Sequence, residues 1–224
     1  MLWLFRLPPV VYLGVAPLGV IGAGYLFITD QQSESAKAAA LAGKAPAAVT
    51  IEAFDPAKNV GAANEVTVLA QIDVSRVVDL SETKKGRERD HWVIAPLYPT
   101  NATDAGGQAS GMMIQRGNAT VEQLAKMAVG EGKIGPIVSL NGLSVDPSSE
   151  SKAIDEVKDQ ITVKPGGVYI DPFEDGRAAG LAPSSDGKFA ALAILIVSLL
   201  VGAFGAFGFQ RARRGATAYR EGTI

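Results

Sequence analysis

The sequence predicts an α+β external domain, an antiparallel sheet or partial barrel with two short helices, held between two transmembrane helices. Two uncharged apolar runs lie near the ends of the 224-residue chain, and each is long enough to cross a bilayer. Between them, short apolar or alternating runs are separated by clusters of Gly, Pro, Asn and Asp. This pattern is typical of strands joined by turns.

The run from Phe189 to Phe209 predicts the second membrane helix. It contains no charged residue, and its only hydroxyl belongs to Ser198, which can bond back to a carbonyl of its own helix. At ~1.5 Å per residue the run spans about 31 Å, which is close to the thickness of one hydrocarbon core. A chain in lipid must satisfy its own backbone hydrogen bonds, so we expect a helix.

A second uncharged run, from Leu7 to Ile28, predicts the first membrane helix. Pro17 lies inside it and is expected to kink the helix. The alternative is a cleaved signal peptide. The run is long for such a peptide, and no small-x-small cleavage site follows closely, so we expect a retained anchor.

Basic residues set the predicted orientation. Arg6 precedes the first helix, and Arg211, Arg213 and Arg214 follow the second. The positive-inside rule then places both termini in the cytoplasm, where these arginines can also contact anionic lipid headgroups. The Ala- and Gly-rich composition hints at a bacterial source, so the expected location is the bacterial inner (cytoplasmic) membrane. The expected segments are a cytoplasmic N-terminus (1–6), a membrane helix (7–28), a periplasmic domain with a tether (29–188), a membrane helix (189–209) and a basic cytoplasmic tail (210–224).

The periplasmic segment begins with Gln31 to Pro46, which is either a helical extension of the first span or a mobile tether. Glu65 to Val74 predicts a strand, because apolar residues alternate with the others at a period of two. The residues on the expected apolar face are Val66, Val68, Ala70, Ile72 and Val74.

The mixed charge run Ser81–Asp90 surrounds Gly86 and is expected to form a solvated hairpin tip. The alternative is a loop that docks a charged partner. The basic residues of that loop are Lys84, Lys85, Arg87 and Arg89.

The rest of the domain predicts further strands and two helices. We expect strands at His91–Tyr98, Gly111–Gln115 and Gly135–Val145, the first two forming an antiparallel hairpin. Helices are expected at Thr120–Val129, where Gly130 is the cap, and at Ser148–Gln160. Two short strands, Ile161–Val163 and Val168–Ile170, flank a turn at 164–167, and Asp171–Gly187 is loop-like.

The sequence carries no recognisable catalytic or metal-binding pattern. It has no cysteine, and His91 is its only histidine, which excludes thiolate catalysis, histidine clusters and cysteine-ligated metals. Asp171, Glu174 and Asp175 could line a cation site, but turn and cap roles are favoured because calcium-loop spacing is missing. No phosphate-binding motif and no basic stripe is present, and the net charge is −2. We therefore expect no enzyme activity, cofactor, nucleic acid or small-molecule substrate.

The two apolar runs carry small residues but no ionisable ones, which argues against a transporter. Small residues let helices approach closely in lipid. They can pack the two spans on each other or dock them on the helices of other membrane-protein subunits. The expected helix-docking residues are Gly14, Gly19, Ala23, Ser198, Gly202, Gly205, Ala206 and Gly208.

Four segments resemble the Surfeit locus family of cytochrome oxidase assembly factors: EVTVLAQID, HWVIAPLYP, IVSLNGLSV, and MMIQRGNAT with Gln115, Arg116 and Gly117. The resemblance implies two spans around one large external domain and a role in assembling an oxidase. The Trp-Gln-x-x-Arg motif that follows the first span in that family is missing, and neither span contains a histidine. The resemblance therefore implies no haem-handling role here.

Together these features favour a non-catalytic accessory or assembly subunit of a larger energy-transducing complex, respiratory or photosynthetic, in the inner membrane. Lipid and the subunits of that complex are its expected partners. One alternative is a transient Surfeit-type assembly factor. The other is a membrane-anchored periplasmic scaffold or sensor, which is disfavoured because the short basic tail leaves no room for a signalling domain.

Overall fold

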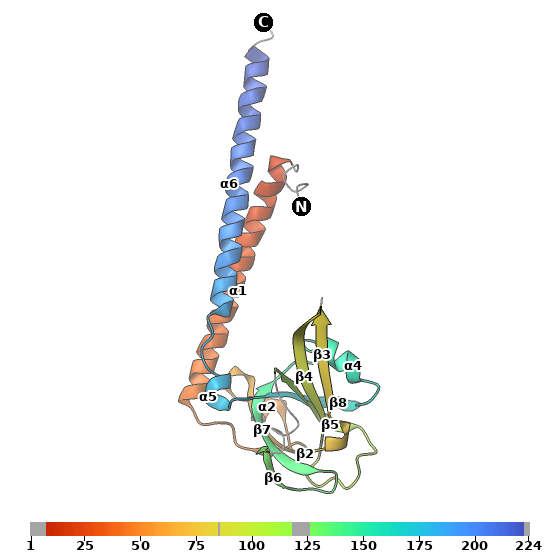
Figure 1. Ribbon diagram of the computed structural model, residues 1–224. Helices are drawn as coiled ribbons and strands as arrows, with labels where there is room; N and C mark the ends of the chain where they lie inside the picture. The colour runs from red at the N-terminus through yellow and green to blue at the C-terminus, as the bar shows by residue number, and fades with distance from the viewer. Residues whose placement is uncertain (1–7, 85, 118–125, 222–224) are drawn as a thin grey trace. The chain divides into compact units, whose positions relative to one another are not determined.

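The computed structural model describes residues 8–84, 86–117 and 126–221 (Figure 1). The chain divides into two compact units, one formed by Met1–Ser35 with Pro183–Ile224 and the other by Ala36–Ala182. The first unit holds most of helix α1 (Pro9–Ala42) and all of α6 (Asp186–Glu221), and we call it the helix pair. The second unit holds the strands, and we call it the barrel.

Helix α6 contains the predicted span 189–209, and α1 contains residues 9–28 of the predicted span 7–28, whose first residue lies outside the described residues. Both helices are long and apolar enough to cross a membrane. Of the two alternatives for residues 31–46, the structure has the helical extension, which reaches Ala42. There the N–H of Gly43 donates to the carbonyls of Ala39 and Ala40, which ends the helix. Helix α6 continues through the basic tail as far as Glu221.

Five strands of the second unit close into a barrel. The pairing order is β2–β4–β5–β8–β7, and β7 pairs back with β2 through seven residue pairs, from Glu65↔Leu143 to Gln71↔Ile137. The short strands β1 and β6 extend the sheet beside β2 and β7, and β3 pairs with β4. The strands are β1 Val49–Thr50, β2 Glu65–Ile72, β3 Val78–Lys84, β4 Arg87–Tyr98, β5 Ala109–Arg116, β6 Ala128–Glu131, β7 Pro136–Ser144 and β8 Val163–Pro172.

The strand directions differ in part from the antiparallel sheet that the sequence predicts. Pairs β5–β8 and β1–β2 are parallel, because long connections bring the chain back in the same direction. A period of two identifies a strand but does not encode its direction. A five-stranded Greek-key barrel with this strand order and one parallel pair, here β5–β8, has the arrangement of an OB fold.

Two large apolar clusters stabilise the strands of the barrel, and a smaller third one is formed by Ala40, Phe173 and Leu181. The interior is filled by side chains from all five strands, among them Val68, Leu97, Met113, Leu140 and Ile170. A second cluster on the outer face joins β4 and β5 to helix α4 (Ser151–Val157). Helix α4 lies within the predicted helix 148–160. The shorter helices are α2 (Pro56–Asn59) and α5 (Arg177–Gly180), and 3₁₀ turns lie at Ala62–Asn64 and Val74–Arg76.

Strand β2 shows where alternation predicts burial correctly and where it does not. Val66, Val68, Ala70 and Ile72 are fully buried as expected. Val74 is 45% exposed, so its place on the apolar face was wrong. The strand ends before it, and the Asp73 carboxylate accepts from the Ser75 N–H to begin a 3₁₀ turn.

Two other local predictions have clear outcomes. The hairpin tip at Ser81–Asp90 is confirmed, because β3 and β4 form the hairpin, although both strands continue into the charge run. The turn at 164–167 was wrong, because β8 runs through these residues and a register shift between Ala109 and Gly111 of β5 absorbs them, with Gly166 at φ +74°.

The helix predicted at Thr120–Val129 falls mostly on residues 118–125, which lie outside the described residues. Its end was wrong, because β6 begins at Ala128 and pairs with Val138 of β7. Gly130 therefore lies within β6 and does not cap a helix. Pairing with β7 overrides the local helical pattern there.

Candidate functional site

Most of the predicted helix-docking residues line the seam between α1 and α6 within the helix pair. A Cβ built at Gly19 would overlap the Oγ of Ser198, and one at Gly205 would lie 2.8 Å from the Cβ of Tyr12. At Gly202 the nearest atom would be the Ala16 Cβ, at 3.2 Å. Gly208 similarly faces Pro9, and Ala23 is buried. These residues therefore pack the two helices against each other.

Two of the predicted docking residues face away from that seam. A Cβ built at Gly14 would meet nothing within 4 Å, and Ala206 is exposed. The same open space surrounds Gly22 and Gly24 of α1. Small residues are thus placed for both roles that the sequence allows. Those at the seam pack α1 on α6, and those on the outside leave room for a helix of another subunit.

The outside of the helix pair is covered with large apolar side chains. Leu18 is 67% exposed, Ile21 68%, Leu200 64% and Phe207 66%. Soluble monomers rarely expose so many large apolar side chains, whereas lipid tails or another apolar helix can cover them. This surface is the most extensive candidate for interaction in the described part of the chain.

The predicted basic residues are only partly described. Arg211 is exposed on α6, and Arg213 and Arg214 lie on the same helix. Arg6 and Lys85 lie outside the described residues. Lys84, Arg87 and Arg89 are placed only by the backbone of the β3–β4 hairpin. Their roles in orientation and in partner docking remain predictions.

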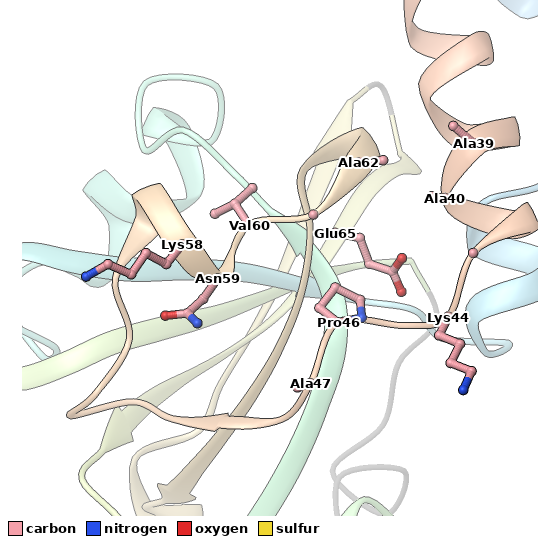
Figure 2. A pocket seen from close by; sticks show the side chains of 12 residues that line it. Ala39, Ala40, Lys44, Pro46, Ala47, Lys58, Asn59, Val60, Ala62 and Glu65 are labelled. Atoms are coloured by element: carbon pink, nitrogen blue, oxygen red, sulfur yellow. The ribbon is translucent and has the colours of Figure 1, made fainter.

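In the barrel unit, a pocket of about 420 Å³ lies between the last turn of α1 and the start of β2 (Figure 2). Small residues such as Ala40, Pro46 and Ala62 form much of its wall. Figure 2 shows the Glu65 carboxylate directed into the space between β2 and α1, whereas the ammonium group of Lys58 points away.

Glu65 is almost fully buried and is held by a two-pronged ion pair with Arg177. The Arg177 Nε donates to Oε1 at 2.7 Å and its Nη2 donates to Oε2 at 3.0 Å. The amide of Asn141 also donates to Oε1, at 3.0 Å. Burial opposes ionisation of Glu65, but the hydrogen bonds from Arg177 and Asn141 outweigh it and lower the pKa of this carboxyl.

Arg177 also donates to the carbonyls of Ala40 and Gly43 at the end of α1. A single guanidinium thus joins the end of α1 to the first barrel strand and matches the negative end of the helix dipole. Because these partners already use the Glu65 carboxylate, we assign the pocket a structural role.

A second polar cluster lies on the outer face, where β4, β5, β8 and the start of α4 meet. The Arg116 guanidinium stacks 5.6 Å from the Trp92 ring centre, and the indole Nε1 donates to Glu150 Oε2 at 3.3 Å. Burial, the nearby Glu150 carboxylate and Glu174 raise the pKa of Asp171 to about 6, although Arg116 acts in the opposite direction.

This cluster does not form a metal centre. Among the described residues, no group of three or more His, Asp or Glu side chains could hold an ion. His91 instead bonds to Asp79 through Nε2 at 2.7 Å and to the Gly117 carbonyl through Nδ1, which fixes the base of the β3–β4 hairpin. Within the described part of the chain, Asp171 is therefore a carboxyl with a raised pKa that belongs to no group able to hold a metal ion.

The OB-type barrel raises the question of a nucleic-acid role, because such barrels bind oligonucleotides on the face of their second and third strands. Here those strands are β4 and β5, and α4 covers that face through contacts of Ala153 and Val157 with Trp92 and Ile114. The covered face weighs against that role.

No family model matches the chain, and no curated protein matches it.

The seam glycines and the outward glycines could both be predicted from the sequence, because small residues at helical spacing indicate close helix packing. The Glu65–Arg177 pair and the Trp92–Arg116 stack were missed. Each joins residues far apart in the chain, and the only hint was a glutamate at the head of an alternating apolar strand.

Proposed function

We propose that the chain is a membrane-anchored, non-catalytic accessory subunit that binds a larger membrane complex. Its helix pair crosses the bilayer with both ends in the cytoplasm, and the barrel is displayed on the periplasmic side. The observation that carries the proposal is the outer surface of the helix pair, where large apolar side chains are exposed and small ones are buried at the seam.

The outward glycines support a contact beyond the pair itself. Gly14 and Ala206 are not needed to pack α1 on α6, so they remain available to a helix of another subunit. The buried ion pair and the polar cluster of the barrel hold the fold together and offer no reactive group. An energy-transducing client follows only from the Surfeit resemblance and is the narrower form of the proposal.

The test is co-purification from mildly solubilised membranes. Gly14→Leu is expected to lower partner recovery about tenfold, a loss of about 1.4 kcal/mol, because leucine blocks a close helix approach. Gly22→Leu, at a position of α1 that is equally open but was not predicted to dock, is the matched control and should retain the partner. Equal recovery with both variants, or recovery of the native chain alone, would contradict the proposal.

The proposed orientation can be tested separately by labelling the barrel from outside the cell. The chain has no cysteine, so one introduced at exposed Lys133 reports on the barrel alone. An impermeant maleimide applied to spheroplasts should label it. Absence of labelling until the cells are lysed would reverse the orientation.

A further inference from the structure

A groove of about 490 Å³ runs between α1 and α6 within the helix pair. Val20, Ala23, Gly24 and Phe27 line it from α1, while Ala191, Leu192 and Leu195 line it from α6. Ala23 and Ala191 are buried at its floor, and a Cβ at Gly24 would meet nothing within 4 Å. The eight residues from Val20 to Phe27 correspond to about 10 Å along the helix.

One lining residue is charged, and it stands at one end of the groove. Lys188 is exposed and has no acidic partner among the described residues. It directly precedes the apolar run that begins at Phe189, so it lies at the boundary between the apolar and polar parts of the pair. An apolar groove that ends in a free ammonium group matches a molecule with a hydrocarbon chain and a phosphate.

The carboxylates at the same end define the headgroup further. Asp30 lies one turn beyond Phe27, against Gly187, and its Oδ2 is buried without a hydrogen-bond donor. Asp186 lies in the first turn of α6, and Glu34 accepts from the Ser184 N–H. Three carboxylates beside one ammonium would repel a purely anionic headgroup. They favour one that brings its own cation.

We propose that this groove binds one phospholipid whose headgroup carries both a phosphate and a primary ammonium, as phosphatidylethanolamine does. One acyl chain fills the groove, the phosphate pairs with Lys188, and the ammonium donates to Asp30. A choline headgroup has a cation but no N–H to donate, and a glycerol headgroup has no cation. The inference rests on the membrane setting of the proposed function but not on any protein partner.

The experiment is native mass spectrometry of the purified, delipidated full chain in detergent. Phosphatidylethanolamine, phosphatidylcholine and phosphatidylglycerol are added separately at equal concentration. The wild-type chain should retain one phosphatidylethanolamine, at least about fivefold more than either other lipid, a difference of about 1 kcal/mol. Equal retention of all three lipids, or preference for phosphatidylglycerol, would overturn the proposal.

Matched variants locate the site. Gly24→Leu fills the groove and should reduce retention about tenfold, whereas Gly14→Leu, outward on the same helix but outside the groove, should not. Lys188→Gln should weaken all three lipids, and Asp30→Asn should remove the preference for phosphatidylethanolamine. Equal lipid retention by Gly24→Leu and Gly14→Leu would overturn the groove assignment.

The two proposals fail in different ways. Lipid retention is measured on the isolated chain, so a failure of Gly14→Leu to release a protein partner leaves the lipid result standing. If instead Gly24→Leu released a protein partner and left the lipid bound, the occupant would be a helix of that partner, and the lipid proposal would be wrong.

Discussion

The helix pair and the barrel bury opposite kinds of side chain. At the seam of the helix pair the buried residues are small, such as Ala16, Ala23 and Ser198, while large apolar side chains point outward. In the barrel the large side chains are buried. Within the described part of residues 36–182, the exposed large apolar residues are Val74 and Val129.

This contrast is the one expected if the helix pair lies in lipid, as proposed, and the barrel lies in water. Water drives large apolar side chains inward, which fills the barrel with residues such as Met113 and Leu140. Lipid gives no such drive, so close packing of small residues decides what faces inward. Charge follows the same division, because the buried ion pair Glu65–Arg177 lies in the barrel, whereas the apolar run 189–209 contains no charged residue.

The largest expected effect comes from placing charge on exposed apolar positions of each unit. Val197→Asp with Leu200→Asp should cost about 6 kcal/mol of membrane insertion, at ~3 kcal/mol for each aspartate near the centre of a span. Val74→Asp with Val129→Asp adds the same charge at exposed barrel positions and should have little effect. Carbonate extraction of membranes measures the difference.

If both double variants stay equally in the membrane pellet, the outside of the helix pair does not face lipid. The comparison is matched because the four positions are all between 45% and 64% exposed. In water, substitutions at such positions would be nearly neutral in both units.

The second effect concerns the buried charge of the barrel. Glu65→Ala removes the carboxylate that neutralises the Arg177 guanidinium and should lower the free energy of unfolding by about 3 kcal/mol. Glu52→Ala removes an exposed carboxylate that bonds to Thr100 and serves as the control, with an effect within about 0.5 kcal/mol. Urea unfolding of the detergent-solubilised chain, followed by Trp92 fluorescence in a Trp3→Phe background, provides the measurement.

Equal stability of these two variants would mean that the Glu65–Arg177 pair contributes nothing beyond a surface carboxylate. Glu65→Gln should be intermediate, because its amide oxygen can still accept one bond from Arg177.

The sequence predicts the helix pair better than the barrel, for a physical reason. A long apolar helix is encoded in one continuous stretch of sequence, so the runs at 7–28 and 189–209 suffice to predict both long helices. Single barrel strands also have a local sequence signal, and alternation and turn residues predict β2, β4, β5 and β7. The pairing of strands that are distant in sequence has no local signal. The parallel β5–β8 pair, for example, depends on the fold of the chain between Arg116 and Val163.

The candidate sites divide in the same way. Gly19 and Gly202 could be identified from helical spacing, but which glycines face the seam and which face outward depends on how α1 and α6 pack. The groove at Gly24 follows from that packing as well. Glu65 and Arg177 are 112 residues apart, and no periodicity connects them.

The smallest expected effect compares two carboxyls within the barrel. The pKa of Asp171 is raised to about 6 from an ordinary value of 3.8, so its protonation favours the folded state. This contribution is fully present below pH ~3.8 and is lost as the pH rises through about 6. The pKa of Glu65 is lowered, so its contribution is present above its ordinary pKa and is lost only on acidification.

Between pH 5 and 7 the two carboxyls therefore affect stability differently, because the contribution of Glu65 is constant while that of Asp171 falls. In a His91→Gln background, which removes the chain's one histidine, the barrel should lose about 1 kcal/mol of stability over this range, after allowance for solvent screening. Asp171→Asn should flatten the response and leave the barrel more stable at pH 7. If the stability of the His91→Gln chain rises with pH over this range, Arg116 would have a larger effect on Asp171 than burial and Glu150.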